Sequence, residues 1–499
     1  MKLTKVIVLI LVLVLLLPSC EKEDATNSTP QIKYEKLTEI ILSDSEITVN
    51  GSPASTLSDS PVYTANDIIY YESGTDFTYG EGTQNDMHDA ADADAHTVVH
   101  ITKAGNYKIS GTLSRGQIAI DLGDGAKNDE NAVVTLILSG VDIICEVAPA
   151  IIFYNVYECG STDTSTATKD VDTSRAGANV IIADGTENSV RGAYVARIYK
   201  PDSVVLSEDG TSVADAKKLH KYDGALYSKM SMNVDGEKDG SGVLTINAAN
   251  EGLDSELHLT INGGNIKIYS GNDGINTNED GVSVTTVNGG TLNINVLGTT
   301  GEGDGIDSNG WLVINGGSIT AYACMYSMDA GIDSDMGIYI NGGKVLAVGN
   351  MFGRIENSGQ NYAVFNFQHP LGTINPIVLE NDAGESVMSV EQRYYRNIFF
   401  SSPELKTGVY TIKNSQDTLW VKANDGNMQH PGMPGEIPGE TPPQMSESFD
   451  QSLDKPQKPN GEGSGIYPMN TDDYKTEFEV VDGANFYSVI EPNKIIWSD

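Results

Sequence analysis

The chain has 499 residues and carries 31 basic against 69 acidic residues, for a net charge of -38. Such an acidic protein is not expected to bind nucleic acid, because phosphate binding requires clusters of Lys and Arg. The carboxylates favour either simple solubility or the binding of a divalent cation. Gly contributes 52 residues, and this composition favours many short strands and tight turns over long helices.

Residues 1–19 have the three parts of a lipoprotein signal peptide. Two lysines precede an apolar run, Val6–Leu17, which is too short to cross a bilayer. The residues after this run resemble a bacterial lipobox, which makes Cys20 the lipidated residue; the alternative is a chance Cys after an ordinary signal. Residues 21–24 resemble the short signal that sends lipoproteins to the outer face of the outer membrane. With residues 20–35 as a polar tether, we expect a lipid-anchored protein in the outer membrane, at the cell surface.

An Asn-Gly-Gly unit recurs four times in the middle of the chain, at intervals of 26, 27 and 26 residues. Apolar and polar residues alternate on both sides of each copy, which is typical of a strand, a tight turn and a second strand. Gly supplies the positive φ that such a turn requires. The copies begin at Asn262, Asn288, Asn315 and Asn341.

A second unit is interleaved with the first. Each copy has Leu or Ile after a Gly or Ala, and we expect this aliphatic side chain to enter the core while the next side chain points outward. The five copies are Asp223–Ser228, Asn250–Ser255, Asn272–Thr277, Gly303–Ser308 and Asp329–Ser334. Because the two units alternate regularly along the chain, they predict an all-β fold, specifically a right-handed parallel β-helix with one coil per repeat. A β-propeller is the main alternative, but its blades run to about 40 residues.

The predicted β-helix covers residues 36–427. Residues 428–465 are rich in Pro, Gly, Met and Glu, cannot bury a core, and are expected to form a disordered insertion. Strand-like alternation returns afterwards, so residues 466–499 are expected to supply closing strands.

Polar residues at matching positions of the second unit predict two columns along the β-helix. The outward column, after the aliphatic position, consists of Asp254, Asn276, Asp307 and Asp333; the neighbouring column, at the corner before it, consists of Glu251, Asp273 and Asp304, with Asp329 one place earlier in its copy. Carboxylates at strand spacing repel each other by about 1 kcal/mol in water, and Ca²⁺ held by oxygen ligands relieves this repulsion. The alternative is a solvated ladder of turn-forming residues.

Several short motifs occur in a recognisable order. They are Ile101–Gly111, Leu138–Ile143, Ala148–Ile151 and Asp223–Lys229, followed by the two repeated units. This succession, over about residues 65–425, resembles the Cthe_2159-type carbohydrate-binding domain family. The resemblance implies a pectate-lyase-like right-handed β-helix with bound calcium, and a role in binding plant cell-wall polysaccharides such as cellulose and polygalacturonate. The long insertion departs from the family's compact pattern.

The sequence contains neither a GxSxG nor an HExxH motif. We therefore expect a calcium-binding, non-catalytic, polysaccharide-binding lipoprotein; a calcium-dependent pectate-type lyase and a surface adhesion protein are the alternatives. A neutral glucan would need exposed aromatic side chains on which to stack. The candidates are Trp311, Tyr322, Tyr326, Tyr339 and Tyr269, and each could equally belong to the core.

Overall fold

The computed structural model describes residues 36–367, 376–391, 395–414, 417–426 and 473–491. These residues fold almost entirely into strands, which confirms the all-β prediction. The described helical elements are α1 (Ala90–Asp94) and the 3₁₀ turns η1 (Ala126–Asn128) and η2 (Pro201–Ser203). Within the described ranges, no helix has the length and apolar character needed to cross a membrane. Cys20, the predicted signal peptide and tether, and the 428–465 insertion lie outside these ranges.

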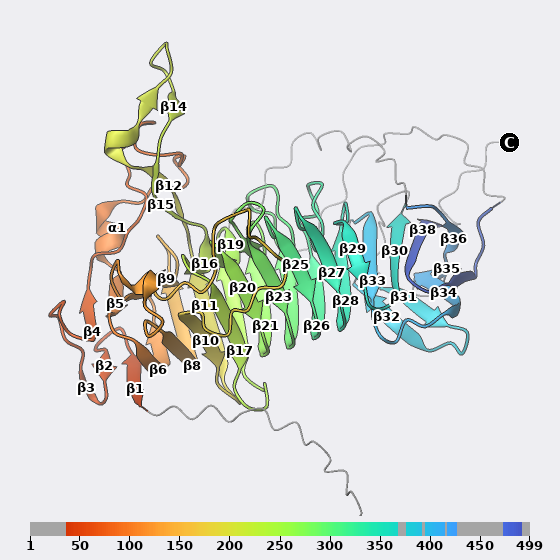
Figure 1. Ribbon diagram of the computed structural model, residues 1–499, viewed down its shortest axis with the longest axis horizontal. Helices are drawn as coiled ribbons and strands as arrows, with labels where there is room; N and C mark the ends of the chain where they lie inside the picture. The colour runs from red at the N-terminus through yellow and green to blue at the C-terminus, as the bar shows by residue number, and fades with distance from the viewer. Residues whose placement is uncertain (1–35, 368–375, 392–394, 415–416, 427–472, 492–499) are drawn as a thin grey trace, which may run out of the picture. The chain divides into compact units, whose positions relative to one another are not determined.

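Strands from successive turns of the chain lie side by side in three columns of parallel strands (Figure 1). Column one consists of β1 (Leu37–Leu42), β6 (Gly105–Leu113), β8 (Val134–Cys145), β10 (Ala178–Ile182), β17 (Met232–Gly236), β20 (His258–Ile261), β23 (Val284–Val287), β25 (Trp311–Ile314), β27 (Gly337–Ile340) and β29 (Ile355–Ser358). Column two begins on the second half of β8 and continues through β11 (Glu187–Gly192), β18 (Val243–Ala248), β21 (Asn265–Ser270), β24 (Thr291–Val296), β26 (Ser318–Tyr322) and β28 (Lys344–Gly349). Column three consists of β5 (Thr97–Ile101), β7 (Gly116–Asp121), β9 (Ile151–Asn155), β16 (Gly224–Ser228), β19 (Glu251–Ser255) and β22 (Ile275–Thr277).

The Asn-Gly-Gly units form the corners between columns one and two. In every copy the second glycine has a positive φ, from 84° at Gly343 to 89° at Gly264, as the turn prediction requires. The pairing also places equivalent residues above one another, so that Val287 lies between Ile261 and Ile314. One repeat of the sequence therefore adds one strand to column one and one strand to column two.

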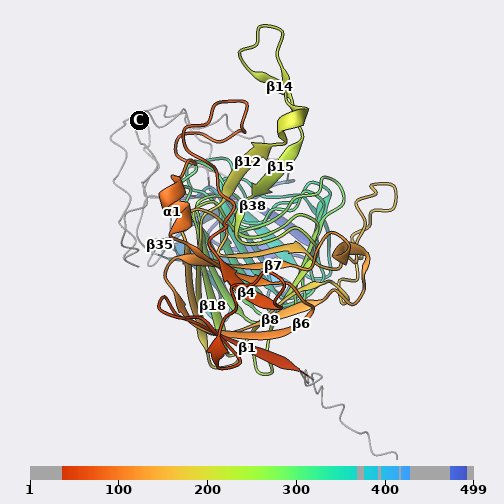
Figure 2. The same ribbon diagram turned by 90° about the vertical axis from the view of Figure 1, so that its left-hand side faces the viewer.

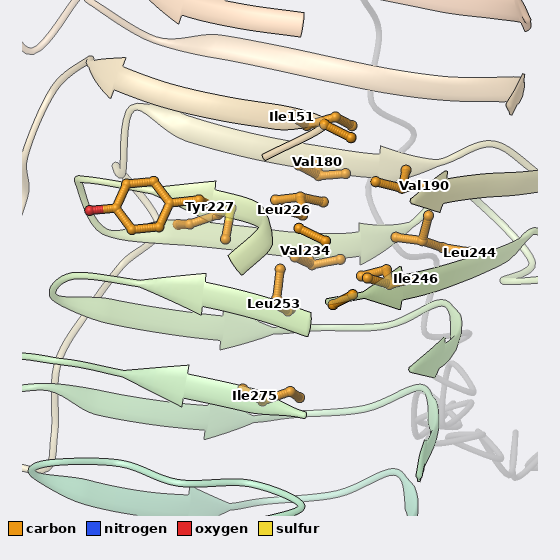
Figure 3. Packing of buried hydrophobic residues seen from close by; sticks show 14 of the residues in the cluster. Ile151, Val180, Val190, Leu226, Tyr227, Val234, Leu244, Ile246, Leu253 and Ile275 are labelled. Atoms are coloured by element: carbon orange, nitrogen blue, oxygen red, sulfur yellow. The ribbon is translucent and has the colours of Figure 1, made fainter. Parts of the chain in front are cut away.

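The inward-facing side chains of the three columns form one hydrophobic core. Figure 3 shows Leu226, Leu253 and Ile275 stacked in column three, and each is at most 1% exposed. This confirms that the aliphatic position of the second unit enters the core. Tyr227, which follows Leu226, points away from these side chains (Figure 3), as period-two alternation in a strand requires.

Glycine precedes the aliphatic residue because the adjacent turns come too close for a side chain. A Cβ on Gly274 would lie 2.1 Å from Ile294 Cγ2 and 2.5 Å from the carbonyl oxygen of Gly305. We expect Gly274→Val to lower the free energy of unfolding by about 3 kcal/mol, since backbone must move to relieve the overlap. Thermal and denaturant unfolding check this result. Gly125→Val is the control, because a Cβ there meets nothing within 4 Å, and equal effects of the two substitutions would contradict the account.

The strands at the two ends of the columns pair differently. Before column three begins, β2 (Thr48–Val49), β3 (Ser52–Pro53) and β4 (Val62–Ala65) make antiparallel pairs. After β29 the strands are β30 (Tyr362–Phe367), β31 (Ile377–Asn381), β32 (Ser386–Val390), β33 (Asn397–Ser401), β34 (Gly408–Asn414), β35 (Asp417–Thr418), β36 (Trp420–Ala423), β37 (Phe478–Val480) and β38 (Ala484–Ile490). Apart from β30 with β38, these strands pair antiparallel and enclose a second hydrophobic core.

The stacked turns therefore end at Ser358, earlier than the predicted boundary at residue 427. The last turn of a stack leaves a row of unpaired backbone groups at its edge. The antiparallel strand β33 covers part of that edge by pairing with β28. Terminal repeats that differ from internal ones are the usual solution in stacked folds.

Besides residues 66–96, which contain α1, two other long segments of the described chain leave the columns. The first is a loop, residues 156–177, between β9 and β10. The second is an arm of antiparallel strands that projects away from the columns (Figure 2). The arm consists of β12 (Val195–Tyr199), β13 (Val205–Leu206), β14 (Val213–Asp215) and β15 (Lys218–Tyr222). Its returning strand, β15, leads directly into β16 of column three.

Candidate functional site

Three carboxylates meet on column three, next to the base of the arm. One oxygen from each of Asp223, Glu251 and Asp254 lies within 4.8 Å of the others, and all three residues are buried. Among the described residues, this is the one group of three or more acidic, His or Cys side chains gathered so closely. We call it the carboxylate triad.

The pairing of β16 with β19 brings the triad together. Glu251 lies beside Gly224, which follows Asp223, and Asp254 lies beside Tyr227. Asp254 follows the core residue Leu253, so alternation turns its side chain out of the core. Gly224 leaves room for that side chain, because a Cβ there would lie 2.6 Å from Asp254 Cβ. The register between β16 and β19 and the absence of a side chain at Gly224 together allow the three carboxylates to meet.

The triad is outward-facing but covered, contrary to the solvated column that the sequence also allowed. Asp254 is 0% exposed and Glu251 is 5% exposed. Burial, and then the neighbouring carboxylates, raise the pKa of both groups well above the usual range. Burial likewise raises the pKa of Asp223, although Lys221 opposes the shift. The protein therefore holds three carboxyl groups where a free negative charge is strongly disfavoured.

Lys221, on β15 of the arm, supplies a positive charge in contact with the triad. Its Nζ forms an ion pair with Asp223 Oδ2. Burial lowers the pKa of Lys221, but the attraction of Asp223, Glu251 and Asp254 outweighs burial, and the net shift is upward. When all three are ionised, the triad carboxylates and the Lys221 ammonium carry an excess of two negative charges, which one divalent cation would neutralise.

Unpartnered oxygens point to the same ligand. Within the described part of the chain, Glu251 Oε2, Asp254 Oδ2 and Asn276 Oδ1 are buried and have no hydrogen-bond partner. Buried polar atoms of this kind are normally satisfied. The other oxygen of Asp254 accepts a hydrogen bond of 2.6 Å from Asn278 Nδ2. A donor set made only of carboxylate and amide oxygens fits a hard cation such as Ca²⁺ and disfavours zinc.

The remaining predicted metal ligands form a different arrangement. Asp273 Oδ1 accepts the backbone N–H of Asp304 at 2.6 Å, and Asp304 Oδ1 accepts the N–H of Ala330 at 2.5 Å. Asp329 Oδ2 accepts the N–H of Gly303 at 2.7 Å. These carboxyl groups therefore link successive turns of the chain through the backbone.

Burial dominates the electrostatics of this second group as well. Burial raises the pKa of Asp273 to about 8, with Asp307 as the next cause, and the pKa of Asp304 to about 9, with Asp273 as the next cause. It raises the pKa of Asp307 to about 6, with Asp333 as the next cause. Burial also raises the pKa of Asp333. Of the eight predicted metal ligands, only Glu251 and Asp254 lie in the triad, with Asn276 next to Asp254 in the neighbouring strand.

Sequence reasoning missed Asp223 and Lys221. Asp223 opens the first copy of the second unit and occupies the same position in it as Asp329, which was selected. This equivalent position in the repeat is the pattern from which Asp223 could have been predicted. Lys221 comes from the arm, outside the repeats, and no repeated pattern indicates that it reaches the triad.

The five candidate aromatic residues do not form one platform. Tyr322 is 6% exposed and belongs to the second core, so it is not available for stacking on a sugar. Tyr326 is 44% exposed. Tyr269 lies on β21 of column two, whereas Trp311 and Tyr339 lie on β25 and β27 of column one. A flat aromatic surface formed by all five is therefore excluded.

Known proteins resemble this chain in a structural alignment and in a family model. The solved polysaccharide lyase-like protein from C. thermocellum (gadolinium derivative) aligns with a TM-score of 0.37 and 19% identity, over 65% of this chain and 94% of that chain. A search of curated proteins gave no match. A family model described as "carbohydrate-binding domain-containing protein" matches residues 95–362. That match covers more than half of the chain and includes the triad and most of the three columns. The chain therefore belongs to the family of carbohydrate-binding domain-containing proteins.

Proposed function

We propose that this protein is a calcium-dependent, non-catalytic polysaccharide-binding lipoprotein, anchored through Cys20 in the outer membrane and exposed at the cell surface. Family membership supports a carbohydrate ligand. The lipobox-like sequence supports the anchor. We also propose that the three columns form a right-handed parallel β-helix, for which the parallel pairing of successive turns is the support.

The carboxylate triad is the observation that supports calcium most strongly. Asp223, Glu251 and Asp254 would hold the ion, and Asn276 would lie next to them. The bound cation would neutralise the excess charge of the triad and fix the adjoining strands. Because Ca²⁺ accepts six to eight oxygen ligands, the ion would also draw on buried oxygens near the three carboxylates, such as Asn276 Oδ1.

Binding without cleavage is favoured over lyase activity by the state of Lys221. A lyase needs a base that accepts a proton from the sugar ring, and the pKa of that base should lie near the working pH. The carboxylates around Lys221 raise its pKa, on balance, above the ordinary value. Without a bound cation, Lys221 is therefore unsuited to act as that base.

A polysaccharide panel tests the proposal. The chain is mixed with insoluble cellulose and with polygalacturonate covalently coupled to beads, with and without EGTA, and pelleted. We expect the chain in at least one pellet in the presence of calcium and in the supernatant after chelation. We also expect no rise in ultraviolet absorbance from unsaturated uronate. A growing absorbance would identify a lyase, and absence from every pellet would contradict polysaccharide binding.

A further inference from the structure

A groove of about 400 Å³ lies on the outer face of column one, whereas two of the triad residues, Glu251 and Asp254, lie on a strand of column three. Its floor is formed by the outward side chains of β17, β20, β23 and β25 and by the Asn-Gly-Gly corners. Its wall is formed by residues 169–174 of the loop between β9 and β10, which crosses these strands in amber in Figure 1. This volume lies within the usual range of ligand sites.

The loop is fixed to the strands that it crosses. Thr173 Oγ1 donates to Asn233 Oδ1 on β17 at 2.8 Å and lies 2.6 Å from Thr260 Oγ1 on β20. At its other end, Lys169 Nζ lies 5.2 Å from the centre of the Tyr339 ring on β27. The wall therefore has a defined position relative to the floor, and it runs along the direction in which the turns stack.

Four asparagine side chains line the groove in a continuous ladder. The amide of Asn288 donates to Asn262 at 2.8 Å, that of Asn315 to Asn288 at 2.8 Å, and that of Asn341 to Asn315 at 2.7 Å. All four residues are exposed. Each amide has two N–H donors and an oxygen with two lone pairs, so an internal member of the ladder retains one donor and one acceptor site for a ligand.

This arrangement suits a polymer with repeated hydroxyl groups. The ladder presents donor and acceptor sites at the spacing of parallel strands, about 4.8 Å, over four successive turns. The amides are held by one another, so a ligand would not have to order them on binding. A compact small molecule could contact only one or two of these turns.

The charges along the groove favour an uncharged chain. The basic residue that lines the groove, Lys169, pairs with Asp170, and Asp172 adds a further negative charge. An acidic polysaccharide would find no available cation here to pair with its carboxylates. Amide and hydroxyl groups of the floor and wall can pair with the hydroxyl groups of a neutral sugar.

We propose that the asparagine ladder and the 169–174 wall form the binding groove for a neutral, unbranched polysaccharide chain, which lies along the stacking direction. The assignment rests on the proposed polysaccharide-binding function and gives that function a site. The triad would act separately, by stabilising column three and its arm.

Affinity electrophoresis with soluble probes tests this groove. The chain is run through gels containing hydroxyethyl cellulose, mixed-linkage β-glucan or polygalacturonate, with calcium present. We expect retardation by at least one neutral probe, and at least tenfold weaker binding for Asn288→Ala/Asn315→Ala. The matched control is Asn293→Ala, which removes the same kind of side chain from β24 in the same turn as Asn288 but from column two.

The outcomes separate the two proposals. If no polysaccharide retards the wild-type chain, both the function and the groove are wrong. If the wild-type chain is retarded and the double variant binds equally well, or if polygalacturonate alone retards it, the groove assignment fails while the function stands. Circular dichroism checks that the variants fold, and Asn315→Asp provides a second variant that keeps the size of the side chain and adds one negative charge.

Discussion

After removal of calcium, the stability of this protein should fall as pH rises from about 4 to about 9. Burial raises the pKa of Asp307 to about 6, of Asp273 to about 8 and of Asp304 to about 9. The folded chain therefore retains protons that the unfolded chain, with aspartate near its ordinary value of about 3.9, has already released. By linkage, the stabilisation is fully present below the unfolded pKa and is lost as pH rises through the folded values. The pKa shift of Asp307 alone corresponds to a loss of about 3 kcal/mol in the free energy of unfolding over this pH range.

Thermal unfolding at a series of pH values, in EGTA and in calcium, measures this effect. Calcium at the triad is expected to raise stability at neutral and alkaline pH, because Glu251 and Asp254, whose pKa values burial also raises, would bind the cation in their ionised form. Stability in EGTA that rises between pH 5 and pH 8 would contradict the assigned burial of these groups. Identical curves with and without calcium would contradict the metal site.

Neutralising the triad should have opposite effects on calcium binding and on the metal-free fold. Glu251→Gln/Asp254→Asn removes two of the three carboxylates and keeps the size of both side chains. We expect calcium affinity to fall on the order of 100-fold, because ligand charge sets affinity in such sites. We expect the metal-free chain to become more stable by about 1–2 kcal/mol, because the unfavourable burial of two carboxyl groups is relieved.

Calcium titration calorimetry and denaturant unfolding in EGTA measure the two effects. The matched control is Glu279→Gln/Asp280→Asn, which removes the same two charges from the turn after β22, outside the triad. The control should keep calcium affinity and stability close to wild type. A metal-free triad variant that is less stable than wild type would indicate that the carboxylates serve as ion-pair partners of Lys221 and do not form a cation site.

The all-β architecture and much of the core could be predicted because they depend on short-range rules that repeat. Alternation places Leu253 and Ile275 in the core, and the positive φ of Gly264 requires glycine at the corner. These constraints recur in every turn, so the same residue types appear at equivalent positions of several repeats. The antiparallel strands after Ser358 carry no repeat, so no comparable pattern predicts how they pair.

The site was less predictable because it depends on contacts between distant segments. Alternation correctly turns Asp254 out of the core, yet the side chain is 0% exposed, with Tyr227 and Asn276 beside it in the neighbouring strands. Asp304 also lies in a repeated position, but its carboxyl group binds the backbone of Ala330. A repeated acidic position therefore identifies a column, and the contacts around each member decide between a metal ligand and a backbone acceptor.

A crystal structure of the chain grown with calcium tests the central claim most directly. The account predicts an anomalous peak at the triad, with oxygens of Asp223, Glu251 and Asp254 at calcium–ligand distances of about 2.3–2.6 Å. An empty triad in which Lys221 alone balances the three carboxylates, in crystals that hold calcium elsewhere, would contradict it.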